Sequence, residues 1–233
     1  VYCLGCGQCM AFCPTLACTA PGLEREDCRP LSAQDMPTPR QADELAFSRR
    51  SVRNFKDRTI PREELEDLLA AVRFAPTAKN TQNLRWILLD SRERVLQLAE
   101  LVVAWMRELP RIDPELDEAM HAGGLVRAWD RGVDVITRTA PQLAVVVAPQ
   151  WRWGQPDAVI AATYLELLAQ ARGIGCCWAG YLCMAFEHPA AQEVRDFLGI
   201  REGEMAFAAQ MMGYPRFKAH ARPPRKNAHI TWK

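Results

Sequence analysis

The stretch Arg49-Arg50-Ser51-Val52-Arg53-Asn54-Phe55 places three arginines and a serine within five residues and ends on a phenylalanine. A guanidinium is planar and always charged, and its fixed donors suit a phosphate or a carboxylate. In an extended segment alternate side chains lie on one side of the backbone, so Arg49, Ser51 and Arg53 would face together. The stretch therefore predicts either a binding site for one anionic group or a solvated basic segment ahead of a helix.

The composition is that of an ordinary globular protein. The chain has 233 residues, of which 49% are hydrophobic and 24% charged, enough for one full core or for one domain with a small appendage. The formal net charge is +1, and no apolar run approaches the roughly 18 residues of a membrane-spanning helix. We expect neither nucleic acid nor a membrane as a partner.

The nine cysteines are unevenly spread along the chain. Six lie within the first 28 residues, and the other three are Cys176, Cys177 and Cys183. Disulfide scaffolds of short secreted chains favour even counts, so an odd count indicates metal or redox use in a reducing compartment. We therefore expect a cytoplasmic protein.

The sharpest motif is the run Cys3-x2-Cys6-x2-Cys9-x3-Cys13-Pro14. Bacterial ferredoxins hold [4Fe–4S] clusters with this spacing, because three thiolates two residues apart can wrap one cluster. A zinc knuckle or free thiols are the alternatives, although zinc sites usually combine two CxxC pairs separated by a longer loop. We expect Cys3, Cys6, Cys9 and Cys13 to be metal ligands.

This motif occurs only once in the chain. In two-cluster ferredoxins the fourth cysteine ligates the other cluster, so the stretch resembles the second half of such a domain. The first three cysteines would then need a fourth ligand from a motif upstream of Val1; the alternative is a single cluster completed by Cys18 or Cys28. We expect an incomplete ferredoxin-like segment over residues 1–30, a proline-rich linker over 31–44 and a packed domain over 45–233.

Hydrophobic periodicity and turn signals outline that packed domain. The predicted helices span residues 61–75, 156–172 and 190–198, and the predicted strands span residues 85–90, 142–148 and 205–212. A further helix should follow Asp90, which forms a capping box with Glu93. Residues 108–132 contain two prolines and three glycines, so we expect an irregular segment that covers a site.

Three more segments carry groups suited to flat or anionic ligands. The loop Pro76–Gln82 is rich in amide and hydroxyl side chains, and Gly173–Tyr181 is bracketed by glycines that let backbone approach a flat ligand. The alternative for the second segment is a tight strand entry with Cys176 and Cys177 as buried thiols. The tail from Gly213 to Trp232 is basic and proline-rich.

Taken in order, these stretches resemble the FMN-dependent nitroreductase family. The matching stretches are Arg49–Phe55, Pro76–Gln82, the Ala140-Pro141 pair before an apolar strand, Gly173–Gly180, and Gly213-Tyr214-Pro215 ahead of the basic tail. The resemblance covers residues 45–233, and the front segment resembles the subgroup with a ferredoxin-like [4Fe–4S] domain. It implies an α+β fold with a central, mostly antiparallel sheet flanked by helices. It also implies an intertwined homodimer with FMN at the interface.

The resemblance further implies which residues bind the cofactor. Those expected at the FMN phosphate and ribityl chain are Arg49, Ser51 and Arg53, with Arg50 nearby and with Arg225 and Lys226 closing on the phosphate. Asn80 and Gln82 would meet the flavin, while Pro76, Thr77, Ala78 and Lys79 would reach the partner's FMN. Backbone of Trp178, Ala179 and Gly180 would lie against the isoalloxazine ring. Asn83-Leu84 departs from the Pro-Trp pair that often follows the family's glutamine.

The function implied is that of an oxidoreductase whose chemistry belongs to the cofactor, so no catalytic side chain is expected. A ping-pong reaction would reduce nitroaromatics, quinones or related electrophiles, with NAD(P)H, the iron–sulfur cluster or a ferredoxin-type protein as electron source. The alternatives are an electron-transfer flavo-iron–sulfur protein without its own small-molecule substrate, and an iron–sulfur sensor that binds flavin structurally.

Overall fold

A four-stranded sheet in the order β1-β2-β4-β3 forms the centre of the molecule, and every neighbouring pair of strands is antiparallel. The structure is a computed structural model that describes residues 3–15 and 17–233. The strands are β1 (Arg85–Leu89), β2 (Gln142–Pro149), β3 (Gly175–Trp178) and β4 (Glu204–Gly213). The continuous apolar run of β2 is buried almost throughout, as expected of a central strand covered on both faces. The predicted α+β fold with an antiparallel sheet is confirmed.

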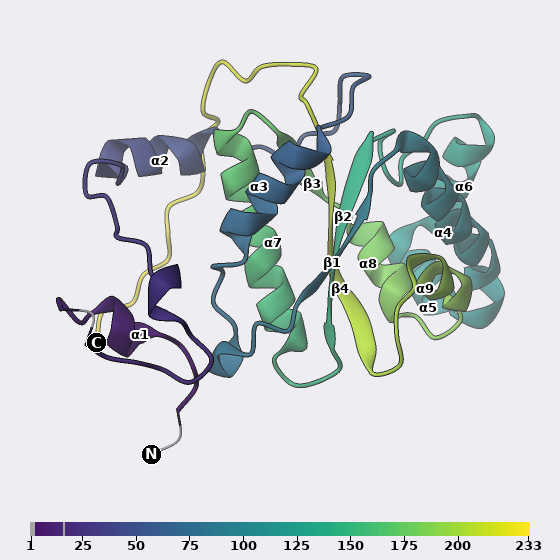
Figure 1. The fold of residues 1–233 in the computed structure, drawn as a ribbon. Coiled ribbons are helices and arrows are strands. Elements are labelled where there is room, and N and C mark those ends of the chain that lie inside the picture. Colours follow the sequence, from purple (N-terminus) through teal and green to yellow (C-terminus); the bar gives the residue numbers. More distant parts are fainter. Residues whose placement is uncertain (1–2, 16) are drawn as a thin grey trace.

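Helices cover both faces of this sheet (Figure 1). On one face lie α3 (Arg62–Val72) and α7 (Gly154–Ala171). On the other face α4 (Arg92–Ile112) and α8 (Gly180–Glu187) contact the sheet, and α4 in turn carries α5 (Pro114–Met120), α6 (Ala122–Asp130) and α9 (Gln192–Leu198). The larger apolar core fills the α4–α8 side and a second core fills the α3–α7 side.

The helix after β1 begins one residue later than the sequence pattern indicates. The Ser91 hydroxyl accepts a hydrogen bond from the Arg94 amide at 3.4 Å, so the predicted capping box of Asp90 and Glu93 is wrong. Ser91 is extended and its short side chain reaches the free amides of the first turn, which is the usual role of a serine N-cap.

The predicted irregularity of residues 108–132 is also wrong, because α4 continues to Ile112 and α5 and α6 follow. Pro110 lies in the last turn of α4, where it removes a single backbone hydrogen bond. Complete burial of Leu109 in the core offsets that loss. The Asp113 carboxylate accepts from the Leu116 amide at 3.0 Å and Pro114 occupies the first turn of α5, so these residues start a helix.

The front of the chain contains α1 (Gln8–Ala11), a 3-10 turn over Arg25–Asp27 and α2 (Pro39–Ser48). Helix α2 crosses the predicted boundary between linker and domain at residue 44. Thr38 and Gln41 form a reciprocal capping box with Pro39 in the first turn, so the proline-rich stretch that was predicted to be a linker begins a helix. In the view of Figure 1 this front segment and the C-terminal tail both lie on the α3–α7 side of the sheet.

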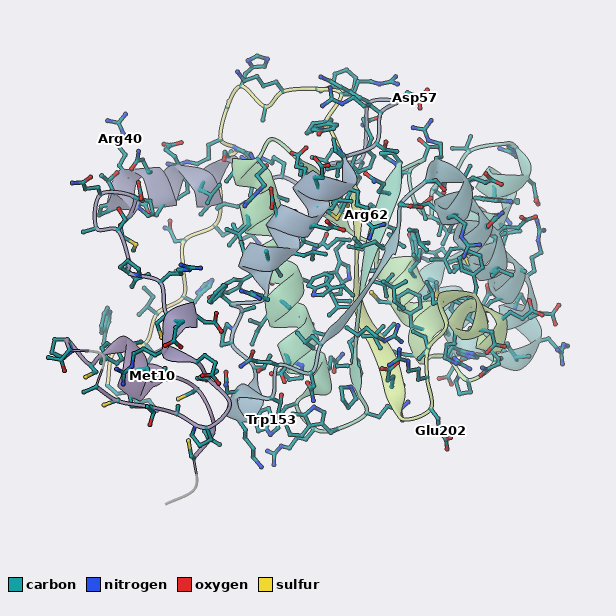
Figure 2. The ribbon with its side chains drawn as sticks, viewed as in Figure 1. Met10, Arg40, Asp57, Arg62, Trp153 and Glu202 are labelled. Atoms are coloured by element: carbon teal, nitrogen blue, oxygen red, sulfur yellow. The ribbon has the colours of Figure 1, made fainter. Side chains whose placement is uncertain are left out.

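The two ends of the sheet differ in what they carry. At one end lie the start of β1, the end of β2 and the start of β4. At the other lie the start of β3 and the end of β4, where Gly175 pairs with Gly213. Glu202 lies at the first of these ends and Asp57 at the second (Figure 2). None of the described helices combines the length and apolar character needed to cross a membrane.

Candidate functional site

The basic stretch at residues 49–55 docks along β3. The Val52 amide donates to the Cys176 carbonyl at 2.9 Å, and Ser51 forms a parallel bridge with Cys176. An added Cβ on Gly175 would come within 2.6–2.9 Å of three Val52 side-chain atoms, so the close approach requires a glycine there. The glycine-bracketed segment was predicted to let backbone approach a flat ligand. At Gly175 the group that approaches it closely is Val52 of the arginine stretch.

Beside this contact lies a half-open hollow of about 440 Å³, which we call the arginine hollow. Ser51 and Arg53 enter it from the docked stretch, and Arg138 enters from the segment before β2. The rest of its lining consists of Trp178, Ala179 and Gly180 at the end of β3, together with Val135, Ile136, Cys177, Tyr181, Met184 and Met211. The hollow thus combines apolar walls with two guanidiniums, and its volume is in the range of small-molecule binding sites.

The electrostatic character of the hollow is positive. Its lining contains no carboxylate, and Arg53 and Arg138 form no ion pair within residues 3–15 and 17–233. Burial raises the pKa of the Cys177 thiol, while the charges of Arg53 and Arg138 act in the opposite direction. Cys176 and Cys177 are 2% and 5% exposed, and burial also raises the pKa of Cys176. The interpretation of both as buried thiols is confirmed.

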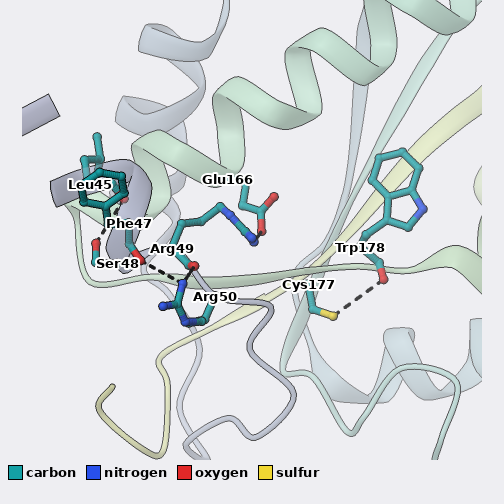
Figure 3. Close-up of polar contacts among 8 residues, drawn as sticks. All are labelled: Leu45, Phe47, Ser48, Arg49, Arg50, Glu166, Cys177 and Trp178. Atoms are coloured by element: carbon teal, nitrogen blue, oxygen red, sulfur yellow. Dashed lines mark hydrogen bonds and ion pairs between the residues drawn. The ribbon is translucent and has the colours of Figure 1, made fainter. Parts of the chain in front are cut away.

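Arg49 and Arg50 do not line this hollow. Arg49 Nη1 donates to Oε1 of Glu166 on α7 at 2.6 Å, whereas Arg50 Nη1 turns back to the carbonyls of Phe47 and Arg49 at 2.9 and 2.5 Å (Figure 3). Arg50 lines a separate hollow with Lys56 and Arg216. The expectation that alternate residues 49, 51 and 53 face together is correct only for Ser51 and Arg53, because Glu166 draws Arg49 to α7.

The amide loop Pro76–Gln82 lies at the opposite end of the sheet, since it leads into the first residue of β1. The Ala78 amide donates to the buried carboxylate of Asp157 at 2.9 Å, and the Asn80 amide side chain donates to the Gly5 carbonyl at 3.1 Å. The Gln82 backbone amide donates to the Thr77 hydroxyl at 3.0 Å. Within one chain the structure does not bring Asn80 or Gln82 to the arginine hollow.

The basic tail is likewise separate from Arg53. Arg225 and Lys226 are exposed and lie outside the arginine hollow. The tail passes α2, where the Arg222 guanidinium stacks 3.9 Å from the Phe47 ring centre, on the α3–α7 side of the molecule (Figure 1). In one chain these two residues therefore do not contribute to the same site as Ser51 and Arg53.

The cysteine run does not form a metal site in the part of the chain that the structure describes. No three His, Cys, Asp or Glu side chains gather there as a ligand group. Cys3, Cys6 and Cys9 are exposed, and the Cys13 sulfur accepts from the Ala17 amide at 3.2 Å and lies 3.5 Å from the Thr15 hydroxyl. Hydrogen bonds from the Thr15 side chain and from the backbone of Cys18, Ala17 and Thr15 lower the pKa of Cys13 to about 6. The predicted [4Fe–4S] site is not supported, because the thiols bond locally or face solvent.

Arg138 is the residue that the sequence reasoning missed. The Asp134 carboxylate accepts hydrogen bonds from the amides of Ile136, Thr137 and Thr139 at 2.9, 2.8 and 2.7 Å, and from the Thr137 hydroxyl at 2.6 Å. This turn holds Arg138 and Thr139 at φ of 56° and 52°. An aspartate followed three residues later by a threonine is a turn signal that could have located the bend, although not the guanidinium's destination.

Replacing Asp134 by alanine is expected to lower the free energy of unfolding by about 2–4 kcal/mol, because it removes a charged acceptor shared by four donors. Urea denaturation measures the change. Asp35→Ala removes an exposed carboxylate and serves as the control, with an unchanged midpoint. Equal midpoints for the two variants would show that the turn does not depend on Asp134.

Comparison with known proteins agrees with this geometry. Residues 46–214 match the model of the Nitroreductase family. An NADH dehydrogenase of Thermus thermophilus is 27% identical over 186 residues, which are 75% of this chain and 86% of that protein.

Two solved structures show the same fold. A nitroreductase with bound FMN from Bacteroides fragilis aligns with a TM-score of 0.66 and 22% identity over 82% of this chain and 97% of the other. A nitroreductase with bound FMN from Desulfitobacterium hafniense aligns with a TM-score of 0.63 and 22% identity over 82% and 98%. With the family model covering residues 46–214, this chain belongs to the nitroreductase family and is an FMN-dependent oxidoreductase.

Proposed function

We propose that the chain reduces nitroaromatics, quinones or related conjugated electrophiles with NAD(P)H as electron source, and that the arginine hollow is its active site. The observation that carries this proposal is that the Arg53 guanidinium, which forms no ion pair with the described residues, lines one apolar-walled space together with Trp178–Gly180. That combination fits FMN, which has an anionic phosphate at one end and a flat ring at the other.

In this proposal Ser51 and Arg53 hold the phosphate and ribityl chain, and backbone of Trp178, Ala179 and Gly180 lies against the ring. When bound there, FMN would supply the redox chemistry, namely hydride acceptance from NAD(P)H and two-electron reduction of the acceptor, with protons from solvent. The chain's own contribution is electrostatic: the Arg53 guanidinium stabilises negative charge that develops in the hollow. Cys177 is buried with a raised pKa and takes no part as a nucleophile.

We also propose that the working unit is a homodimer, in which the partner supplies what one chain lacks. The amide loop with Asn80 and Gln82 lies at the far end of the sheet from the hollow, and Arg225 and Lys226 are exposed. Helix α7 presents an apolar face to solvent, with Val159, Ile160 and Tyr164 between 37% and 40% exposed. Such a face on a long apolar helix suits a subunit interface.

Ile160→Glu is expected to weaken the dimer about 100-fold or more, because an unpaired carboxylate buried at an interface costs about 3 kcal/mol or more. FMN affinity should fall with it if the partner completes the site. Light scattering after size-exclusion chromatography measures the mass. Ala104→Glu adds the same charge to an exposed position of α4 and should remain a dimer. A monomeric wild type, or a dimeric Ile160→Glu variant, would contradict this interface.

The function is tested with the FMN-loaded chain, NADH or NADPH, and 4-nitrobenzamide or 1,4-naphthoquinone as acceptor. We expect oxidation of one donor that requires both FMN and acceptor, together with flavin absorbance at about 450 nm in the purified protein. Bound flavin with no turnover for any donor and acceptor pair would refute the proposal.

An electron-transfer flavo-iron–sulfur protein is the second candidate, favoured by the spacing of Cys3, Cys6, Cys9 and Cys13. As folded, the described thiols do not form a ligand group, so no step of the proposed reaction passes through a cluster. Anaerobic reconstitution decides between the two. Stoichiometric iron and sulfide without NAD(P)H turnover would favour the carrier, and turnover by iron-free protein would favour the enzyme.

The reducing compartment indicated by the nine cysteines leads us to propose a cytoplasmic location.

A further inference from the structure

The arginine hollow contains one more positive charge than the cofactor site uses. Arg53 enters it from the stretch docked on β3, and Arg138 enters from the turn that precedes β2. No carboxylate of the described residues pairs with either guanidinium. In the proposed function Ser51 and Arg53 serve the phosphate and ribityl chain, which leaves Arg138 without a partner of its own.

The backbone that presents Arg138 is strained and firmly supported. Arg138 and Thr139 both have left-handed φ values of 56° and 52°, a conformation that costs on the order of 1 kcal/mol or more for residues with a Cβ. Four hydrogen bonds to the Asp134 carboxylate hold the turn, and Thr137 within it is fully buried. Strain that the surroundings maintain in this way often marks a residue whose placement matters for function.

The surroundings of Arg138 suit a particular kind of ligand. Val135 and Ile136 come from the same segment, and Tyr181 and Met184 line the hollow from α8. These side chains offer apolar contact to an aromatic ring. A guanidinium beside apolar walls binds a carboxylate through two parallel charge-assisted hydrogen bonds, and the low local polarity strengthens them.

We propose that Arg138 is a specificity-determining residue that recognises a carboxylate on the electron acceptor, so that this protein prefers aromatic carboxylates over neutral aromatics of the same shape. The inference rests on the proposed function, because it assigns the acceptor to the same hollow as the cofactor. It makes Arg138 a substrate-binding residue with no part in holding FMN.

The test compares benzoate with benzamide, which has the same ring and nearly the same shape but no charge. Calorimetric titration of the FMN-loaded protein measures both dissociation constants without any turnover. Arg138→Gln is expected to raise the Kd of benzoate about 10- to 150-fold, the range for losing a charge-assisted hydrogen bond, and to change that of benzamide less than about twofold. The KM ratio of 4-nitrobenzoate to 4-nitrobenzamide should shift in the same direction.

Two more variants keep the result interpretable. Arg138→Lys retains the charge without the planar fork, so an intermediate loss for benzoate is expected. Arg131→Gln removes an exposed arginine outside the hollow and should leave every constant unchanged. The FMN Kd should be equal in wild type and Arg138→Gln.

Three outcomes overturn the inference: an unchanged benzoate Kd in Arg138→Gln, an equal loss for benzoate and benzamide, or a raised FMN Kd that makes Arg138 a cofactor ligand. Failure of the proposed function has a different signature, since the wild type would then bind FMN but reduce neither nitro compound. Benzoate selectivity that depends on Arg138 would still be measurable by calorimetry in that case and would support the anion site.

Discussion

Replacing Arg53 by alanine is expected to raise the Kd for FMN about 10- to 150-fold. Arg53 lines the arginine hollow beside Ser51, and no carboxylate of the described residues neutralises it. Losing one charge-assisted contact with a phosphate costs about 1.5–3 kcal/mol, and each 1.4 kcal/mol is about tenfold in affinity. Stability without cofactor should change little, because the exposed side chain forms no protein hydrogen bond of its own in residues 3–15 and 17–233.

Quenching of FMN fluorescence on binding to the apoprotein gives the Kd directly. Arg131→Ala removes an exposed arginine from the C-terminal end of α6 and controls for the general loss of positive charge. Because long-range attraction of an anion is screened by salt, the difference between the two variants should persist at high ionic strength. An Arg53→Ala variant with the FMN Kd of the control would show that the phosphate binds elsewhere.

The local pattern of the chain predicts most of its elements, because the dominant signals are short-range. The strand predicted over 142–148 is β2, and the apolar stripe from Val95 is the buried face of α4. Apart from the capping box assigned to Asp90 and Glu93, the errors occur where proline or glycine was taken as a breaker. Pro110 and Pro114 lie at helix ends, where a missing amide costs little, and burial of Leu109 decides in favour of the helix.

The candidate site was predictable only as far as its residues share a local motif. Ser51, Arg53 and the Trp178–Gly180 segment do meet in one hollow, as the resemblance to the nitroreductase family implies. Arg49 was assigned to the same group, but its destination depends on Glu166, which is 117 residues away in sequence. Arg138 was missed for the converse reason, since only the tertiary position of the Asp134 turn brings its guanidinium to the hollow.

Gly175→Ala is expected to destabilise the fold and to disrupt the proposed cofactor site, and it tests the contact on which the hollow depends. A Cβ at this position would meet the Val52 Cγ2, Cβ and Cγ1 atoms at 2.6, 2.8 and 2.9 Å, well inside ordinary packing distance. Val52 must then move, which strains the hydrogen bond that its backbone amide donates to the Cys176 carbonyl. Overpacking of this kind costs about 1–3 kcal/mol of unfolding free energy. Ser51 and Arg53 flank Val52, so the displacement should also weaken FMN binding by about tenfold or more, through loss of positioned charge-assisted contacts.

Gly124→Ala is the matched control because it makes the same chemical change with the opposite expected sign. Its Cβ would meet only the flexible end of Arg127 at 3.9 Å within helix α6, where alanine is about 0.5–1 kcal/mol more favourable than glycine. Val52→Ala in the Gly175→Ala background removes the atoms at 2.6 and 2.9 Å but leaves the one at 2.8 Å, so part of the stability and FMN affinity should return. Since the two positions touch, their effects should be non-additive. Additive effects, or a Gly175→Ala variant that binds FMN like the wild type, would mean that the arginine stretch is held in place by something other than its contact with β3.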